Sequence, residues 1–273
     1  AELIMLSDIA GYVGADTCGC LLAIRQDQQE EISLMIDIGT NGEMVLGNRE
    51  RMVTCSTAAG PAFEGAKIEC GMRGAAGAVD HVKYEDGKWN YTTVGNKPAV
   101  GLCGSGLIDL VAGLLDAGML DENGVLRSGQ EKQGVFILVP PERGGNERGV
   151  YLTQKDLGEV QLAKAAIAAG IQMLMERLGI TEDDICSVYI AGAFGNYMDP
   201  VSAGKIGLLP ATLVKKVKPV GNAAGEGAKI ALVNEKEMLE MDELVRKIEF
   251  VELAASADFQ DHFIDELGFE TGE

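Results

Sequence analysis

Two apolar segments joined by a three-residue turn constrain the fold more than any other part of this sequence. The segments SLMIDI (33–38) and GEMVLG (42–47) flank the turn GTN, and a third strand-like segment, RMVTCST (51–57), follows closely. Asn41-Gly42 is the kind of dipeptide that supplies positive φ angles in hairpin turns. We therefore predict an antiparallel hairpin and a third strand beside it.

Helical and strand-like segments alternate along the rest of the chain, which indicates a mixed α/β fold. Thr153 and Asp156 resemble a capping box, and the helix that they open is expected to end at Gly179. We expect the other helices at the end of 8–24, near 62–70, at 103–118 and at 221–233. We expect the other strands near 77–84, 88–94, 135–139, 187–191 and 247–253, with a polar excursion around 121–150.

The charge balance excludes one large class of partners. The net charge is −19, and residues 235–273 hold thirteen acids and three bases. Nucleic-acid binding needs Lys and Arg clusters, which this sequence lacks. The acidic end is typical of a solvated surface, and a docking face for a basic partner is the alternative. No apolar run is long enough to span a bilayer, so we expect no membrane association.

The cysteines indicate a reducing compartment. Six are scattered without a CxxC pair, and two histidines are too few for a convincing zinc site. We therefore expect a cytoplasmic protein. The chain begins at Ala1, in what reads as the middle of a domain, so we expect a fragment of a longer protein.

The hairpin turn is the first candidate for chemistry. Asp37 ends a buried strand, and Gly39, Thr40, Asn41 and Gly42 follow it directly. Glycines let backbone N–H groups approach a phosphate, and a carboxylate there can orient an attacking water or hold Mg²⁺ through water. Asp37 is thus the candidate catalytic and metal-associated residue. The alternative is an ordinary Asn-Gly hairpin without a ligand.

Three further glycine loops are candidate nucleotide contacts. The loop at 58–65 offers a ribose contact at a helix start, the loop at 101–106 opens a helix with free N–H donors, and the turn at 191–196 follows a strand as ligand-binding turns do. Each loop also has a structural alternative. The loop at 58–65 is then only a helix cap, the glycines at 101–106 only allow close helix packing, and the aromatic ring at 191–196 only packs in the core. The residues proposed from these loops are Gly60, Glu64, Lys67, Gly104, Ser105, Gly192, Ala193, Phe194 and Asn196. The P-loop motif GxxxxGK[ST] is absent.

The order of these loops resembles the second lobe of the actin, sugar-kinase and DnaK-like (ASKHA) ATPase fold, whose sheet is a ribonuclease-H-like mixed sheet flanked by helices. The sequence motifs resemble one branch of this fold more closely. The carboxy-terminal domain of the reductive activators of corrinoid proteins has segments similar to IDIGTNGE, AAGPAFEGA, GLCGSGLIDL, LTQKDL, AGAFGNYMD, IGLLP and VGNA. The resemblance implies a connecting helix and first-lobe remnant over 1–32 and the nucleotide-binding lobe over 33–273.

The resemblance also implies a function. Members of this family use ATP and Mg²⁺ to return a Co(II) corrinoid protein of a methyltransferase or O-demethylase system to Co(I), and a homodimer is conceivable. Their 2Fe–2S cluster lies in an amino-terminal domain whose cysteine spacing is absent here. The first phosphate hairpin of the fold is also absent, so we expect this chain alone to be inactive. A small-molecule kinase of the same fold and a non-catalytic corrinoid-protein-binding module are the alternatives.

Overall fold

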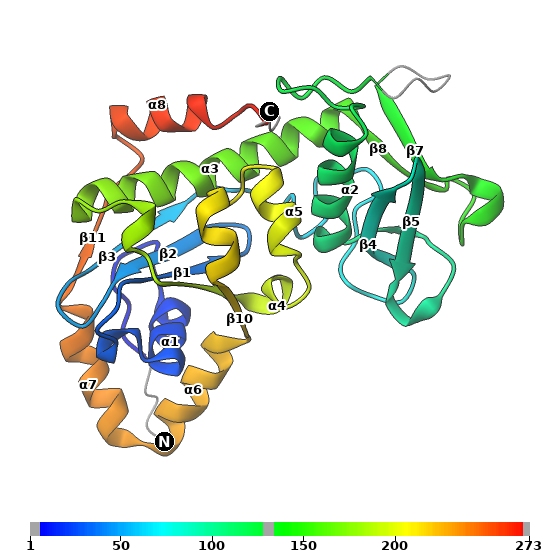
Figure 1. Ribbon diagram of the computed structural model, residues 1–273. Coiled ribbons are helices and arrows are strands. Elements are labelled where there is room, and N and C mark those ends of the chain that lie inside the picture. Colours follow the sequence, from blue (N-terminus) through cyan, green and yellow to red (C-terminus); the bar gives the residue numbers. More distant parts are fainter. Residues whose placement is uncertain (1–5, 128–133, 270–273) are drawn as a thin grey trace. The chain divides into compact units, whose positions relative to one another are not determined.

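The computed structural model describes residues 6–127 and 134–269, and the chain divides into two units (Figure 1). The first unit comprises residues 6–57, 169–196 and 215–262, and the second comprises the remaining described residues. No helix among the described residues is long and apolar enough to cross a membrane.

A six-stranded mixed sheet organises the first unit. The predicted hairpin forms as β1 (Ser33–Ile38) and β2 (Gly42–Gly47), and β3 (Met52–Thr57) pairs antiparallel with β2. The order of strands is β10-β9-β1-β2-β3-β11. The three later strands all run parallel to their neighbours: β9 (Ser187–Ala191), β10 (Val217–Gly221) and β11 (Ile248–Phe250). The expected mixed α/β architecture is therefore confirmed.

Helices cover both faces of this sheet (Figure 1). Met35 and Val45 pack with Leu21 in an apolar cluster on the face covered by α1 (Ala15–Ile24), α6 (Ala223–Val233) and α7 (Glu235–Val245). Met44 points to the opposite face, where Gly170 of α3 (Gln154–Leu178) lies against its side chain. Successive side chains of a strand point to opposite sides, so the central strands β1, β2, β3 and β9 are largely buried on both faces. The first unit also contains α4 (Gly192–Gly195), η1 (Gln26–Gln28), η4 (Glu182–Asp184) and the start of α8 (Ala257–Asp265).

Small residues bring α1 and α6 into close contact. A Cβ on Gly19 of α1 would lie 2.8 Å from the carbonyl oxygen of Ala224, and a Cβ on Gly227 of α6 would overlap the carbonyl oxygen of Gly19. The two backbones approach so closely that neither position has room for a methyl group. This packing explains why 221–233 is rich in glycine and alanine although glycine disfavours helices.

Replacing Gly227 with alanine should destabilise the protein by about 1–3 kcal/mol, the usual cost of adding a methylene to a tightly packed core. The free energy of unfolding in denaturant measures this. Gly158 of α3 is the matched control, since a Cβ there meets nothing within 4 Å. Gly158→Ala should stabilise by about 0.5–1 kcal/mol through helix propensity alone. Equal effects at the two positions would contradict the close α1–α6 packing.

The second unit contains two smaller sheets. One has the order β5-β4-β6 and the other pairs β7 with β8. Asp156 accepts hydrogen bonds from the backbone and hydroxyl of Thr153, so the predicted capping box forms. The strands are β4 (Ala78–Glu85), β5 (Lys88–Thr93), β6 (Gly101–Leu102), β7 (Val135–Val139) and β8 (Val150–Thr153). The helices are α2 (Gly104–Asp116), α5 (Pro200–Lys205), η2 (Val94–Asn96), η3 (Pro141–Arg143) and part of η5 (Ala211–Lys216).

Two local predictions were wrong. The helix expected near 62–70 does not form: the segment is a series of turns, because Gly60 and Gly65 adopt φ angles of 75° and 78° that are not helical. Asn41 and Gly42 do not have positive φ angles. The turn does have the predicted three residues, 39–41, and the Gly39 N–H donates to the Asn41 carbonyl at 2.9 Å.

The carboxy-terminal part also differs from the expectation. The strand predicted over 247–253 is only three residues long, and the helices α7 and α8 on either side of it were not predicted. Acids make up five of the eleven residues of α7 and three of the nine of α8, and they interrupt the helical spacing of the apolar residues.

Candidate functional site

The hairpin turn and its neighbouring strand ends form the candidate site in the first unit. Asp37 lies near the end of β1, paired with Glu43 of β2 on one side and Ala191 of β9 on the other. Thr40 and Asn41 are exposed at the tip of the turn. The carboxylate of Asp37 is thus held by the sheet beside a short, exposed glycine turn.

The carboxylate of Asp16 acts on two other carboxylates at this strand end, those of Asp37 and Glu43. Burial raises the pKa of Asp37, and the nearby Asp16 of α1 raises it further, while the Cys20 thiol, 3.8 Å from Asp37 Oδ2, lowers it. Burial also raises the pKa of Glu43; the Ser56 hydroxyl, which donates to Glu43 at 3.1 Å, opposes this. Asp16 again adds to the rise. The site therefore disfavours its own negative charge.

Asp16 and Glu43 were not among the residues predicted from the sequence. Glu43 could have been found, because a three-residue turn between 38 and 42 places residues 37 and 43 opposite each other. Asp16 lies in the first turn of α1, and its approach to Asp37 depends on how that helix packs on the sheet. No local sequence signal marks it.

The turn after β9 lies directly beside Asp37. Gly192 has a φ of 85°, and a Cβ there would lie 3.0 Å from Asp37 Oδ1. Asn196 is exposed, and a Cβ on Gly221 at the end of β10 would lie 3.1 Å from its Nδ2. Phe194 is half-buried in α4, and the side chain of Ala193 lies outside the described residues. The predicted glycine turn after the strand is confirmed, and the structure brings Asp37 and Gly192 together.

The other predicted contacts belong to the second unit. Gly60 lies in the turn segment, with Lys67 Nζ 4.0 Å from where its Cβ would be, and Lys67 forms an ion pair with Glu159 at 3.1 Å. Glu64 is exposed within the same turns, so neither Glu64 nor Lys67 lies at a helix start. Gly104 and Ser105 do begin α2 as expected, but both are buried, and the Ser105 hydroxyl donates to the carbonyl of Asp80 at 2.8 Å. Their nucleotide roles stay predictions.

Substituting Gly192 tests whether nucleotide binding needs a residue without a side chain at this position. Gly192→Ala should weaken nucleotide binding by about tenfold, because the new methyl group presses on Asp37 while the positive φ strains the backbone. Gly87 is the matched control: its φ of 74° gives similar strain, but a Cβ there meets nothing within 4 Å. Gly87→Ala should leave nucleotide affinity unchanged. Titration with a fluorescent ATP analogue measures both, and equal losses would contradict a role for the Asp37–Gly192 contact.

The residues at this strand end fit a hydrated divalent cation. Asp16 raises the pKa of both Asp37 and Glu43, and a cation held through water would relieve that repulsion. Among the described residues, no group of three or more His, Cys, Asp or Glu side chains is arranged to ligate a metal directly. The six cysteines are all free thiols.

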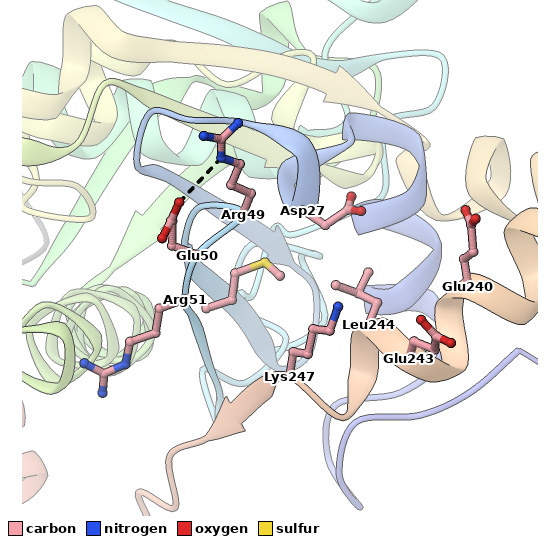
Figure 2. A pocket seen from close by; sticks show the side chains of 9 residues that line it. Asp27, Arg49, Glu50, Arg51, Glu240, Glu243, Leu244 and Lys247 are labelled. Carbon is pink, nitrogen blue, oxygen red and sulfur yellow. Dashed lines mark ion pairs between the residues drawn. The ribbon is translucent and has the colours of Figure 1, made fainter.

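A cavity of about 290 Å³ lies in the first unit, away from this turn. It sits where β2 ends and β3 begins, so it is at the far end of the hairpin from residues 39–41. Figure 2 shows its charged lining, in which Arg49 forms an ion pair with Glu50 and Lys247 extends beside Leu244. None of the predicted site residues lines it.

Comparisons with known proteins identify the family. Residues 31–273 match the model described as the C-terminal domain of RACo, the ASKHA domain. The corrinoid activation enzyme RamQ of Eubacterium limosum is 38% identical over 94% of this chain and 45% of its own length. A reductase of the Co(II) methylated amine-specific corrinoid protein from Methanosarcina barkeri is 30% identical over 99% of this chain and 52% of its own length.

A solved structure supports the same conclusion. The reductive activator for the corrinoid, iron–sulfur protein superposes with a TM-score of 0.90 and 40% sequence identity, over 97% of this chain and 44% of its own. The chain thus spans about half the length of the relatives it matches. The agreement of sequence and structure extends over nearly every element described above. The chain therefore belongs to the family of C-terminal ASKHA domains of RACo, the reductive activators of corrinoid proteins.

Proposed function

We propose that this chain is the nucleotide-binding and partner-docking part of an ATP-dependent activator that returns a Co(II) corrinoid protein to Co(I). The observation that carries the proposal is the match to relatives that are named for corrinoid activation and reduction. The reduction adds one electron to the corrinoid cobalt. That electron comes from outside this chain, since we expect the 2Fe–2S cluster only in the amino-terminal domain of the complete protein.

In this proposal the hairpin turn holds the phosphates of ATP. Residues 39–42 approach them through backbone groups, because the turn is short and its tip is exposed. Asp37 orients the attacking water or a water bound to Mg²⁺, and its location on a buried strand keeps it in place. The turn at 192–196 supports the adenosine, with Asn196 as a hydrogen-bonding side chain. Mg²⁺ would neutralise the phosphates beside Asp37 and Glu43, whose pKa values burial and Asp16 already raise.

ATP hydrolysis would drive the reduction by changing how the activator binds its partner. A ligand shifts a conformational equilibrium only by its differential affinity for the two states. Nucleotide binding and release at the hairpin turn would supply that difference. The free thiols of the chain are compatible with a reducing compartment, and we place the protein in the cytoplasm.

Gly39→Val in the complete activator tests the phosphate site. A branched side chain at the start of the turn would occupy the space that the phosphates need, so nucleotide affinity should fall by at least about tenfold. Isothermal titration with ADP and Mg²⁺ measures the affinity. Gly74→Val, at an exposed position without a positive φ where a Cβ meets nothing within 4 Å, is the control and should bind normally. Unchanged affinity of Gly39→Val would mean that the phosphates bind elsewhere.

Corrinoid-dependent hydrolysis separates this function from its alternatives. Stimulation of ATP turnover in the complete protein by the Co(II) corrinoid partner supports the activator. Stimulation by a sugar or an acid instead would indicate a kinase of the same fold, and no turnover under any condition would indicate a binding module.

A further inference from the structure

The outer edge of the six-stranded sheet is open at β11. β11 is the last strand in the sheet order and pairs only with β3 among the described residues. Val251 N–H donates to the Thr54 carbonyl at 2.8 Å, in register with the pair Phe250–Thr54. Successive residues of a strand direct their backbone groups to opposite edges, so the N–H and C=O of Phe250 point away from β3.

The opposite edge of the same sheet, formed by β10, carries residues that disfavour pairing with another strand. β10 carries Pro219, which has no N–H to donate, and the exposed Lys218. Proline and lysine are the residues that natural edge strands use to prevent pairing with other chains. β11 has neither within Ile248–Phe250. The two edges therefore differ, because β11 lacks the proline and lysine that β10 carries.

A groove of about 370 Å³ runs along this open edge. Met173 of α3 and Val251 give it an apolar floor, and both are partly exposed. The groove extends from the carboxy-terminal half of α3 across β11 to Asp258 of α8. It therefore offers an extended chain both backbone partners and an apolar surface.

The rim of the groove is acidic. Glu176 pairs with His262 at 2.9 Å, and Glu249 pairs with Arg51 and Arg177. Two more carboxylates, Glu252 and Asp258, are exposed and have no cationic partner among the described residues. An occupant with lysine or arginine side chains would supply these missing partners.

We propose that the β11 edge binds an extended, basic segment of a partner protein by β-strand addition. Backbone hydrogen bonds to the open edge would give affinity, and pairing of basic side chains with Glu252 and Asp258 would give selectivity. The proposal is independent of the nucleotide site, because the groove lies at β11 and the hairpin turn lies between β1 and β2. It assigns a function to part of the acidic carboxy-terminal segment.

Fluorescence anisotropy with a dye-labelled peptide of alternating lysine and valine tests the proposal. The peptide should bind the chain saturably, and the same peptide with glutamate in place of lysine should bind at least about tenfold more weakly. Methylating every backbone amide of the lysine peptide should abolish binding, since the methyl groups remove its donors. Equal binding of the methylated peptide would show a purely ionic attachment and would overturn the strand-addition proposal.

Variants of the chain locate the binding site. Glu252→Lys combined with Asp258→Lys should weaken binding of the lysine peptide by about tenfold, because attraction becomes repulsion. Asp183→Lys combined with Glu31→Lys is the charge-matched control, because it replaces two exposed acids that do not line the groove. It should bind like the unmodified chain. Equal loss in both variants would mean that only net charge matters, and a concentration-dependent dimer that the peptide does not dissociate would assign the edge to a second copy instead.

Discussion

Asp37→Asn should lower the rate of ATP hydrolysis by the complete activator by about 10²- to 10³-fold, the usual effect of removing one essential catalytic group. Asparagine has nearly the same shape as aspartate, so the sheet and the neighbouring Gly192 turn are not disturbed. It cannot carry the negative charge that orients a Mg²⁺-bound or attacking water. Nucleotide affinity should therefore change much less than turnover, and steady-state kinetics with a separate binding titration distinguish the two.

Glu43→Gln is the matched control for this prediction. Glu43 lies opposite Asp37 on β2 and its pKa is raised by the same burial and by the same neighbour, Asp16. If Asp37 has the catalytic role, Glu43→Gln should retain turnover within about tenfold. Equal losses in the two variants would mean that the shared negative charge, and not Asp37 itself, supports hydrolysis.

Stability provides an independent check on Asp37→Asn. The pKa of Asp37 is raised in the folded protein, so the folded state holds that proton more tightly than the unfolded state does. Stability from this group is present at low pH and is lost as the pH rises through the folded-state pKa. Asparagine removes this loss, so the variant should melt no lower than the unmodified protein at neutral pH. A lower melting temperature would indicate a structural cause for lost activity.

This chain alone should hydrolyse ATP at least about 100-fold more slowly than the complete activator. Phosphoryl transfer depends on groups positioned on both sides of the transferring phosphate, and losing one donor alone costs about 2.7–4 kcal/mol. The chain spans about half the length of its relatives, and its sequence contains a single candidate phosphate hairpin. Removing a whole lobe should also expose the phosphates to water.

Parallel hydrolysis assays on the chain and on the complete protein, each with and without the corrinoid partner, measure this difference. The folding of the chain alone is checked by its denaturant unfolding curve, because an unfolded chain would be inactive for a different reason. Equal rates in a folded chain and in the complete protein would mean that this half suffices, and the two-lobe proposal would fail.

Local sequence determined the elements whose partners are close in the chain. The hairpin at 33–47 was predictable because its strands are adjacent, strongly apolar and joined by a short turn. The capping box at Thr153 and the glycine turn after β9 were predictable for the same reason, since their hydrogen bonds and φ angles are set within a few residues. The family resemblance extended these local elements to the correct fold.

Tertiary structure alone decided which distant residues lie next to these local elements. Asp16 approaches Asp37 because α1 packs closely against α6 on the sheet, and the glycines that permit this are far apart in the sequence. The segment near 62–70 has helix-forming residues, but the positive φ angles of Gly60 and Gly65 make it a series of turns. β11 joins β3 from nearly the other end of the chain. Sequence by itself determined the hairpin, the capping box, the glycine turn after β9 and the family of this protein. The charge cluster and the open sheet edge arise from contacts between distant residues, which local propensity does not encode.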